Sequence, residues 1–230
     1  MTYVMSDLHG CYDLYLKMLE KIEFSDDDIL YLLGDYLDRG DKGFEIILDI
    51  ARRKNVIPLM GNHDYNALSI LAELSVDPDA ADRADMARDL NLWMRNGGRV
   101  TYDTFWQFPA AKRLYLLETI NSFEHYADIE VMGRRFTMVH GGIRDYDPDR
   151  PLDDYNIGDL AYVREDYSKP KFNDKDRFLV TGHTPTALIE NGYEGKIFWS
   201  HDHIAIDCGA VWGCGLGCLC LETLEEYYVI

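Results

Sequence analysis

The chain has 230 residues, of which 47% are hydrophobic and 13% aromatic, so it is long enough to bury a substantial core. Its formal net charge of −18 argues against broad binding to nucleic acids or anionic membranes, because both need a basic surface that replaces counterions. No apolar run approaches the length of a membrane span, and the N-terminus lacks the pattern of a signal peptide, so we expect one cytoplasmic domain over residues 1–230.

The five cysteines are an odd number, and no two of them have the CxxC spacing of a zinc ribbon. The cluster GCGLGCLC at residues 213–220 combines small side chains with glycine, which is typical of a tight strand connection. We therefore expect free buried thiols and assign the cysteines no function.

The first sixty residues alternate short apolar runs with helical patterns, as βαβα architectures do. Strands are expected at residues 2–5, 29–33 and 56–60, and amphipathic helices at residues 11–22 and 44–51. Later apolar runs that predict strands lie at residues 136–139, 178–181, 204–207 and 219–230. The pattern predicts an α/β fold.

Residues 65 to about 125 carry helical patterns with one apolar face, which predicts a helical insertion that covers the site rather than a separate domain. Within it, the acidic segment at residues 77–89 indicates a surface turn or a solvated helix face. Residues 129–139 form a predicted hairpin. The later run His201-Asp202-His203 has a ligand-like spacing, but it directly precedes an apolar strand, so a solvated hairpin is the simpler interpretation.

A polar cluster follows each of five apolar runs. In chain order the clusters are Asp7-Leu8-His9, Gly34-Asp35, Gly61-Asn62-His63, His140-Gly141-Gly142 and Gly182-His183. In open α/β sheets the carboxyl ends of strands line the binding crevice, so we expect these clusters to meet at one edge. A single Asp-Gly or His-Gly pair would be turn chemistry, but five such clusters after five apolar runs favour a functional site.

The clusters combine carboxylate, imidazole and amide groups, which hard or borderline divalent cations accept, whereas calcium prefers oxygen ligands alone. The candidate ligands are Asp7 and His9 for one cation, Asn62, His140 and His183 for a second, and Asp35 as a bridge. Two cations about 3.5–4 Å apart grip a phosphoryl group and lower the pKa of bound water. The sequence therefore predicts hydrolysis of a phosphate ester by in-line attack of a bridging hydroxide.

The leaving alkoxide needs a proton, and His63 is the candidate general acid, with Asp38 orienting and charging its imidazole. Arg39 offers a planar fork for phosphate oxygens, and Arg164 is a second candidate clamp. Asn62 is a candidate substrate contact as well as a ligand. An ion pair of Arg164 with the acidic residues that directly follow it is the competing interpretation.

Together these motifs resemble the calcineurin-like metallophosphoesterases, specifically the bacterial form of the phosphoprotein phosphatase family. The resemblance runs from DLHG through GDYLDRG, GNHD, VHGG and TGHT to IAIDCGAV at residues 204–211, nearly the whole chain. It implies a β-sandwich of two mixed sheets flanked by helices, and two divalent metal ions, usually manganese, with iron or zinc as alternatives. By the resemblance, one metal is bound by Asp7, His9 and Asp35, and the other by Asp35, Asn62, His140 and His183.

The motifs HGCYD at residues 9–13 and GNHD also resemble symmetrical diadenosine tetraphosphate hydrolases, a sister group with the same fold and metals. That group tends to lose the Asp that is intact here in Asp38-Arg39-Gly40, which favours phosphomonoester chemistry. The main hypothesis is a serine/threonine-type phosphatase that acts on a phosphorylated protein or a small phosphate ester. A dinucleoside polyphosphate hydrolase is the alternative, and a binding protein without turnover is a third possibility that the complete ligand set disfavours.

Overall fold

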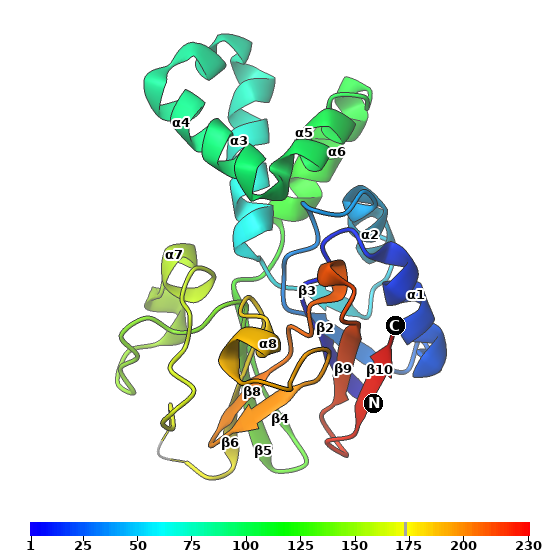
Figure 1. Ribbon diagram of the computed structural model, residues 1–230, viewed down its shortest axis with the longest axis vertical. Helices are drawn as coiled ribbons and strands as arrows, with labels where there is room; N and C mark the ends of the chain where they lie inside the picture. The colour runs from blue at the N-terminus through cyan, green and yellow to red at the C-terminus, as the bar shows by residue number, and fades with distance from the viewer. Residues whose placement is uncertain (173) are drawn as a thin grey trace.

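Two five-stranded β-sheets pack face to face in the computed structural model, which describes residues 1–172 and 174–230 (Figure 1). The first sheet consists of β1 (Thr2–Met5), β2 (Ile29–Leu32), β3 (Val56–Pro58), β9 (Leu216–Cys220) and β10 (Glu226–Val229). Its order is β10-β9-β1-β2-β3. Strands β1, β2 and β3 run parallel, whereas β9 is antiparallel to both of its neighbours, so the sheet is mixed.

The second sheet is also mixed. It consists of β4 (Tyr126–Val131), β5 (Arg134–Val139), β6 (Arg177–Thr181), β7 (Phe198–Ser200) and β8 (His203–Ala205). Its order is β4-β5-β6-β8-β7, with β5, β6 and β8 parallel and an antiparallel strand at each edge. The predicted hairpin at residues 129–139 is the β4–β5 pair, and the predicted α/β sandwich of two mixed sheets is confirmed.

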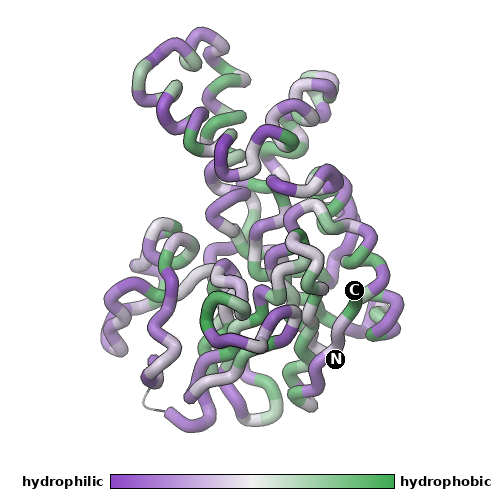
Figure 2. The backbone as a smooth tube through the Cα atoms, viewed as in Figure 1, coloured by the Kyte–Doolittle hydropathy of each residue, from purple (hydrophilic) through white to green (hydrophobic). Residues whose placement is uncertain are grey.

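Strands β1, β8 and β9 are buried along their whole length, as expected for strands that are covered on both faces. Side chains alternate across a strand, so in β1 Tyr3 and Met5 point to the flanking helices while Val4 points to the other sheet. Val4 shares a buried cluster with Phe136 of β5 and Val180 of β6, which joins the two sheets. Hydrophobic residues accordingly concentrate along the strands in Figure 2, and hydrophilic residues along the outer loops.

Helices α1 (Tyr12–Lys21) and α2 (Gly43–Ile50) cover the outer face of the first sheet. Shorter helices lie on the side of the second sheet, namely η3 (Leu152–Asp154), α7 (Ile157–Leu160) and α8 (Thr186–Ile189) (Figure 1). One 3₁₀ turn, η4 (Ala210–Trp212), leads into β9. Among the described residues, no helix combines the length and apolarity needed to cross a membrane.

The middle of the chain is helical and stands at one end of the sandwich (Figure 1). Its elements are α3 (Asn62–Val76), η1 (Pro78–Asp82), α4 (Ala84–Trp93), η2 (Met94–Gly98), α5 (Arg99–Phe105) and α6 (Ala110–Asn121). The first helix begins earlier than the expected residue 65, because GNHD itself forms its first turn. We call residues 65–121 the helical cover.

Candidate metal centre

The parallel strands of both sheets end at the same edge, and the five polar clusters follow those ends. Asp7 and His9 follow β1, Asp35 follows β2, and His140 and His183 follow β5 and β6. Asp7, His9, Asp35 and His183 have positive φ values of 54°, 38°, 58° and 63°, which non-glycine residues rarely adopt. Backbone hydrogen bonds maintain these conformations, including His9 N–H to Asp35 O at 2.8 Å. Such strain concentrates at functional sites.

Asp35 lies at the centre of the cluster. Its Oδ1 is 3.3 Å from His140 Nε2, and its Oδ2 is 3.4 Å from His9 Nε2 and 4.0 Å from His63 Nε2. Two groups of candidate ligand atoms share this carboxylate, one with His9 and His63 and the other with His140 and His183. Asp35 therefore lies between the two groups, and the candidate acid His63 belongs to the first group.

Backbone carbonyls fix which ring nitrogen of two imidazoles faces the site. Nδ1 of His9 donates to the Leu37 carbonyl at 2.8 Å, and Nδ1 of His140 donates to the Leu33 carbonyl at 2.7 Å. Each Nε2 is therefore directed toward Asp35, as in metal-ligating histidines oriented by a carbonyl. Asn62 completes this side, because its Oδ1 lies 3.0 Å from His140 Nε2.

Asp7 lies at the edge of the cluster and connects it to the β6 loop. Its Oδ2 accepts hydrogen bonds from Ser6 Oγ at 2.5 Å and from the His183 N–H at 2.9 Å. A Cβ at Gly182 would lie 2.0 Å from Ser6 Oγ and 2.2 Å from Asp7 Oδ2. Only glycine fits at that position, and this close approach brings His183 to the site.

The pair Asp38 and His63 is buried beside the ligand cluster. His63 Nδ1 donates to Asp38 Oδ2 at 2.7 Å. The helical cover supplies the other partners of this carboxylate, because Trp93 Nε1 donates to Oδ2 at 2.7 Å and Thr101 Oγ1 donates to Oδ1 at 2.6 Å. Both oxygens of Asp38 are therefore hydrogen-bonded, which fixes the orientation of the His63 ring.

The two predicted phosphate clamps lie beside different ligand groups and line one cavity. Arg39 Nη2 is 2.9 Å from His63 Nε2, and its Nη1 contacts His9 Nε2. Arg164 Nη1 donates to Thr184 Oγ1 at 3.0 Å, beside His183. The competing ion pairs of Arg164 are not formed among the described residues, because the two acidic residues that follow it pair with Lys171 and Lys169.

Charges and burial move the pKa values of the cluster in opposite directions. Burial lowers the pKa of His9 and that of His183 to about 3, so both imidazoles are neutral at pH 7. Burial would raise the pKa of Asp35, but the charges of His140 and His63 outweigh it and hold that pKa well below its usual value. Burial would also lower the pKa of His140, but the charge of Asp35 and its hydrogen bond outweigh burial and raise that pKa to about 10. His9 and His183 are therefore ready to accept a cation, whereas His140 would have to lose a proton when it binds one.

The pKa of His63 moves the other way. Burial would lower it, but the charges of Asp35 and Asp38 outweigh burial and raise the pKa of His63 above its ordinary value. The two carboxylates therefore stabilise the protonated imidazole, which is the form that a general acid needs, while the Arg39 guanidinium at Nε2 opposes it.

Asp64 has a structural role that its motif alone did not reveal. It is fully buried at the third position of α3, and its Oδ2 accepts from Asp35 N–H at 2.7 Å, while its Oδ1 accepts from the next two N–H groups, those of Tyr36 and Leu37. Burial and the charge of Asp35 raise the pKa of Asp64 to about 7. The signal in the sequence is an acidic residue in the first turn of a helix, where it caps free N–H groups.

Asp207 is a second buried acid that the sequence did not assign. Burial and the nearby charge of Asp7 raise its pKa well above the usual range, and its Oδ1 accepts from Gly209 N–H at 3.0 Å. The sequence does carry a signal for this role, because Asp207 lies between the apolar strand β8 and Gly209. Trp93 and Thr101 were missed as well, because helical periodicity predicts only that such residues face a core.

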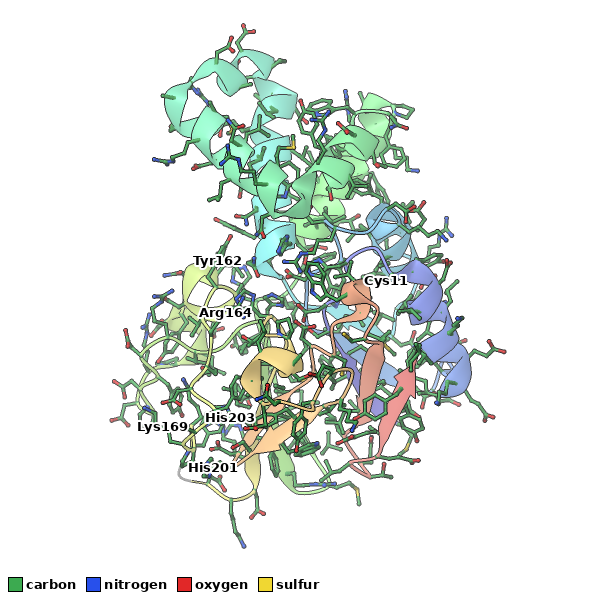
Figure 3. All side chains as sticks on the ribbon, viewed as in Figure 1. Cys11, Tyr162, Arg164, Lys169, His201 and His203 are labelled. Atoms are coloured by element: carbon green, nitrogen blue, oxygen red, sulfur yellow. The ribbon has the colours of Figure 1, made fainter. Side chains whose placement is uncertain are left out.

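The histidines that we left outside the site lie apart from it. In Figure 3, His201 and His203 lie well below Arg164 and Tyr162. Arg164 contacts the backbone of the candidate ligand His183. His201 Nε2 and His203 Nε2 approach the carbonyls of Ser168 and Lys169, each at 3.1 Å. The predicted hairpin is present, because Ser200 pairs with His203 across the turn between β7 and β8, but it is not solvated throughout. His201 is exposed, whereas Asp202 and His203 are buried.

The chain is similar to a protein phosphatase and to a symmetrical tetraphosphatase, and the two matches cover different shares of the chains. Serine/threonine-protein phosphatase 2 of Salmonella typhimurium is 31% identical over 157 residues, which cover 68% of this chain and 62% of that protein. The chain thus spans less than two thirds of that relative's length. A symmetrical bis(5'-nucleosyl)-tetraphosphatase of Aliivibrio fischeri is 26% identical, and the match covers 92% of both chains.

Solved structures share the fold at low sequence identity. A putative diadenosine tetraphosphatase superposes with a TM-score of 0.66 at 18% identity, covering 99% of this chain and 92% of that one. A cold-active protein-tyrosine phosphatase of Shewanella superposes with a TM-score of 0.54 at 18% identity, covering 100% and 80%. The family model of calcineurin-like phosphoesterases matches residues 2–205. The two mixed sheets, the polar clusters at their common edge and this match agree, and the chain belongs to the calcineurin-like phosphoesterase family.

Proposed function

We propose that this chain is a metal-dependent phosphatase that hydrolyses phosphomonoesters, with phosphoserine or phosphothreonine in proteins as its first substrate class. The supporting observation is the buried contact of 2.7 Å between His63 Nδ1 and Asp38, directly beside a carboxylate shared by two groups of imidazoles. A proton donor next to a cation site is the arrangement that cleavage of an unactivated ester needs.

The donor set fits a pair of divalent cations, because carboxylate, imidazole and amide oxygen converge from five loops. The residues that would hold them are Asp7, His9 and Asp35 on one side and Asp35, Asn62, His140 and His183 on the other. When bound, such cations act as Lewis acids on phosphoryl oxygens and lower the pKa of water. Manganese is the proposed metal, with iron or zinc as alternatives.

In the proposed reaction His63 delivers a proton from Nε2 to the leaving oxygen. Asp38 accepts from Nδ1, so the ring keeps its orientation when Nε2 loses its proton. Arg39 lies at the same nitrogen and offers its guanidinium to phosphate oxygens, and Arg164 is placed to contact the substrate from the His183 side. Arg39 also compensates locally for the repulsion that a net charge of −18 exerts on phosphate.

A symmetrical dinucleoside polyphosphate hydrolase is the second candidate. The end-to-end match to the Aliivibrio tetraphosphatase supports it, whereas the phosphatase of Salmonella extends well beyond the matched region. Both candidates would use the same cations and differ in what surrounds the phosphate.

The test is a comparison of kcat/KM for a phosphoserine peptide and for diadenosine tetraphosphate, with manganese, iron and zinc in turn. Our proposal predicts manganese-dependent release of inorganic phosphate from the peptide with the higher kcat/KM. A strong preference for diadenosine tetraphosphate would replace the first candidate with the second. A metal-loaded protein that is inactive on all phosphate esters would contradict both.

A further inference from the structure

A groove of about 670 Å³ runs between helices α3 and α6 of the helical cover, within the range of about 300–1,000 Å³ for binding pockets. It extends along both helices, because its lining runs from Tyr65 to Val76 on α3 and from Ala110 to Asn121 on α6. In Figure 1 these helices belong to the two arms of the cover, which rise from the sandwich. Large apolar side chains of the lining are open to solvent, with Val76 88% and Leu114 58% exposed. An apolar face of this kind is usually covered by a further element or a partner.

The α6 side of the groove has a symmetric pattern. Its residues are Ala110, Arg113, Leu114, Leu117, Glu118 and Asn121. When a second α6 lies antiparallel across the first and is centred on the same point, Arg113 faces the partner's Glu118. Leu114 then faces the partner's Leu117. A two-fold axis repeats each contact, so the face is complementary to itself in charge and in hydrophobicity.

Arg113 and Glu118 are available for such pairing. They lie five positions apart on one helix, whereas side chains on a helix meet when they are three or four positions apart, so they do not pair with each other. Among the described residues neither has an ion-pair partner, and Arg113 stacks on Trp106 with its guanidinium carbon 4.6 Å from the ring centre. A stacked guanidinium keeps the N–H groups at its edge free for a carboxylate.

The distribution of charge also favours contact through the cover. Residues 65–121 carry six basic and eight acidic side chains, a net charge of −2, so the remaining residues carry −16 of the total of −18. Like charge of this size opposes contact between the sandwiches of two copies. The cover stands at one end of the sandwich, so antiparallel covers leave the two sandwiches at opposite ends of the interface (Figure 1).

We propose that a second copy of this chain occupies the groove, and that α3 and α6 of both copies pack as a four-helix bundle with the two α6 helices antiparallel. Under the same symmetry α3 faces the partner's α3, and the small residues Ser69 and Ala72 in the lining let these helices approach. A peptide substrate would also find apolar surface here, but it would not require the symmetric placement of Arg113 and Glu118. The dimer does not depend on the hydrolysis of phosphate esters at the metal centre.

Sedimentation analysis of the full chain tests the interface. The parent protein should form a dimer of twice its mass of 26.6 kDa. Arg113→Glu places a carboxylate opposite the partner's Glu118, and Glu118→Arg places a guanidinium opposite the partner's Arg113, so each single variant should raise the dimer Kd at least about 10-fold. An equimolar mixture of the two variants should form a heterodimer with about the parent Kd, because every facing pair is then opposite in sign.

Arg88→Glu is the matched control, because Arg88 is an exposed arginine of α4 outside the groove, and this substitution changes the net charge equally. It should leave the dimer Kd unchanged. A parent protein that sediments as a monomer at every concentration, a dimer that both charge reversals leave intact, or a mixture that does not recover the dimer would overturn the proposal. In a monomeric parent, slower hydrogen exchange in α3 and α6 on addition of a phosphoserine peptide would assign the groove to the substrate instead.

Discussion

The strand-end loops and the helical cover contribute to one site in different ways. The loops that follow β1, β2, β3, β5 and β6 bring the carboxylate, imidazole and amide groups around Asp35. The cover contributes none of these groups, but its Trp93 and Thr101 hold both oxygens of Asp38. The candidate acid His63 and its partner Asp38 also belong to the strand-end loops, so the cover contributes the positioning of this pair and not the pair itself. Mutations should therefore separate cation binding from proton delivery.

The largest effect is expected from the carboxylate that both ligand groups share. Asp35→Asn keeps the shape and an acceptor for the His63 N–H but removes the charge, so we expect loss of metal binding and a fall in kcat of at least about 10⁴-fold. Metal content by mass spectrometry and phosphatase assays measure both. Asp41→Asn, at an exposed acid nearby, is the control and should behave as the parent. An Asp35→Asn protein that retains its metals would contradict the bridging role.

Replacement of the candidate general acid His63 should lower kcat without loss of the bound cations. His63→Asn should lower kcat on a phosphoserine peptide by about 10²- to 10⁴-fold, because serine alkoxide leaves only with a proton. An aryl phosphate should lose less, since its leaving group is stable as an anion. The exposed His125→Asn is the matched control. Equal losses on both substrates would argue against His63 as proton donor.

The cover should act on the acid through Asp38. Thr101→Val removes a hydroxyl that donates to Asp38 Oδ1, a charged hydrogen bond worth about 1.5–3 kcal/mol, so kcat should fall about 10- to 100-fold with metal content unchanged. Thr104→Val on the same helix controls for the substitution. Loss of the proton of His63 sets the basic limb of the pH profile, so a shift of that limb in Thr101→Val alone would mark a positioning role. A loss of metal instead would show that the cover and the loops are not separable.

Removal of the cations should have the smallest of these effects, a modest fall in Tm, and it should loosen only the loops around the metal centre. A site at about 100-fold its Kd contributes about 2.7 kcal/mol, and each kcal/mol shifts Tm by about 2–4 °C in a chain of this size, so chelation should lower Tm by about 5–10 °C. Hydrogen exchange should then increase in the loops at residues 6–10 and 34–40 but not in α4. An equal increase of hydrogen exchange in α4 would contradict the separate roles of the loops and the cover.

The sequence predicted the loops better than the cover for a physical reason. Each ligand cluster directly follows a short apolar strand, and the ends of parallel strands necessarily meet at one edge. Trp93 at the end of α4 and Thr101 on α5 both contact Asp38, and the π-helical segment η2 between them is kinked at Gly97, with φ 105°. Amphipathic periodicity predicts each helix but not the angle between two helices. Asp64 and Asp207 were missed because their partners are backbone N–H groups, which leave no side-chain pattern.

The most direct test of the account is anomalous diffraction from a crystal grown with manganese. We predict two anomalous peaks about 3.5–4 Å apart, one on either side of the Asp35 carboxylate, with Asp7 and His9 on one peak and Asn62, His140 and His183 on the other. A crystal soaked in millimolar manganese that shows no pair of peaks among these residues would contradict the central claim.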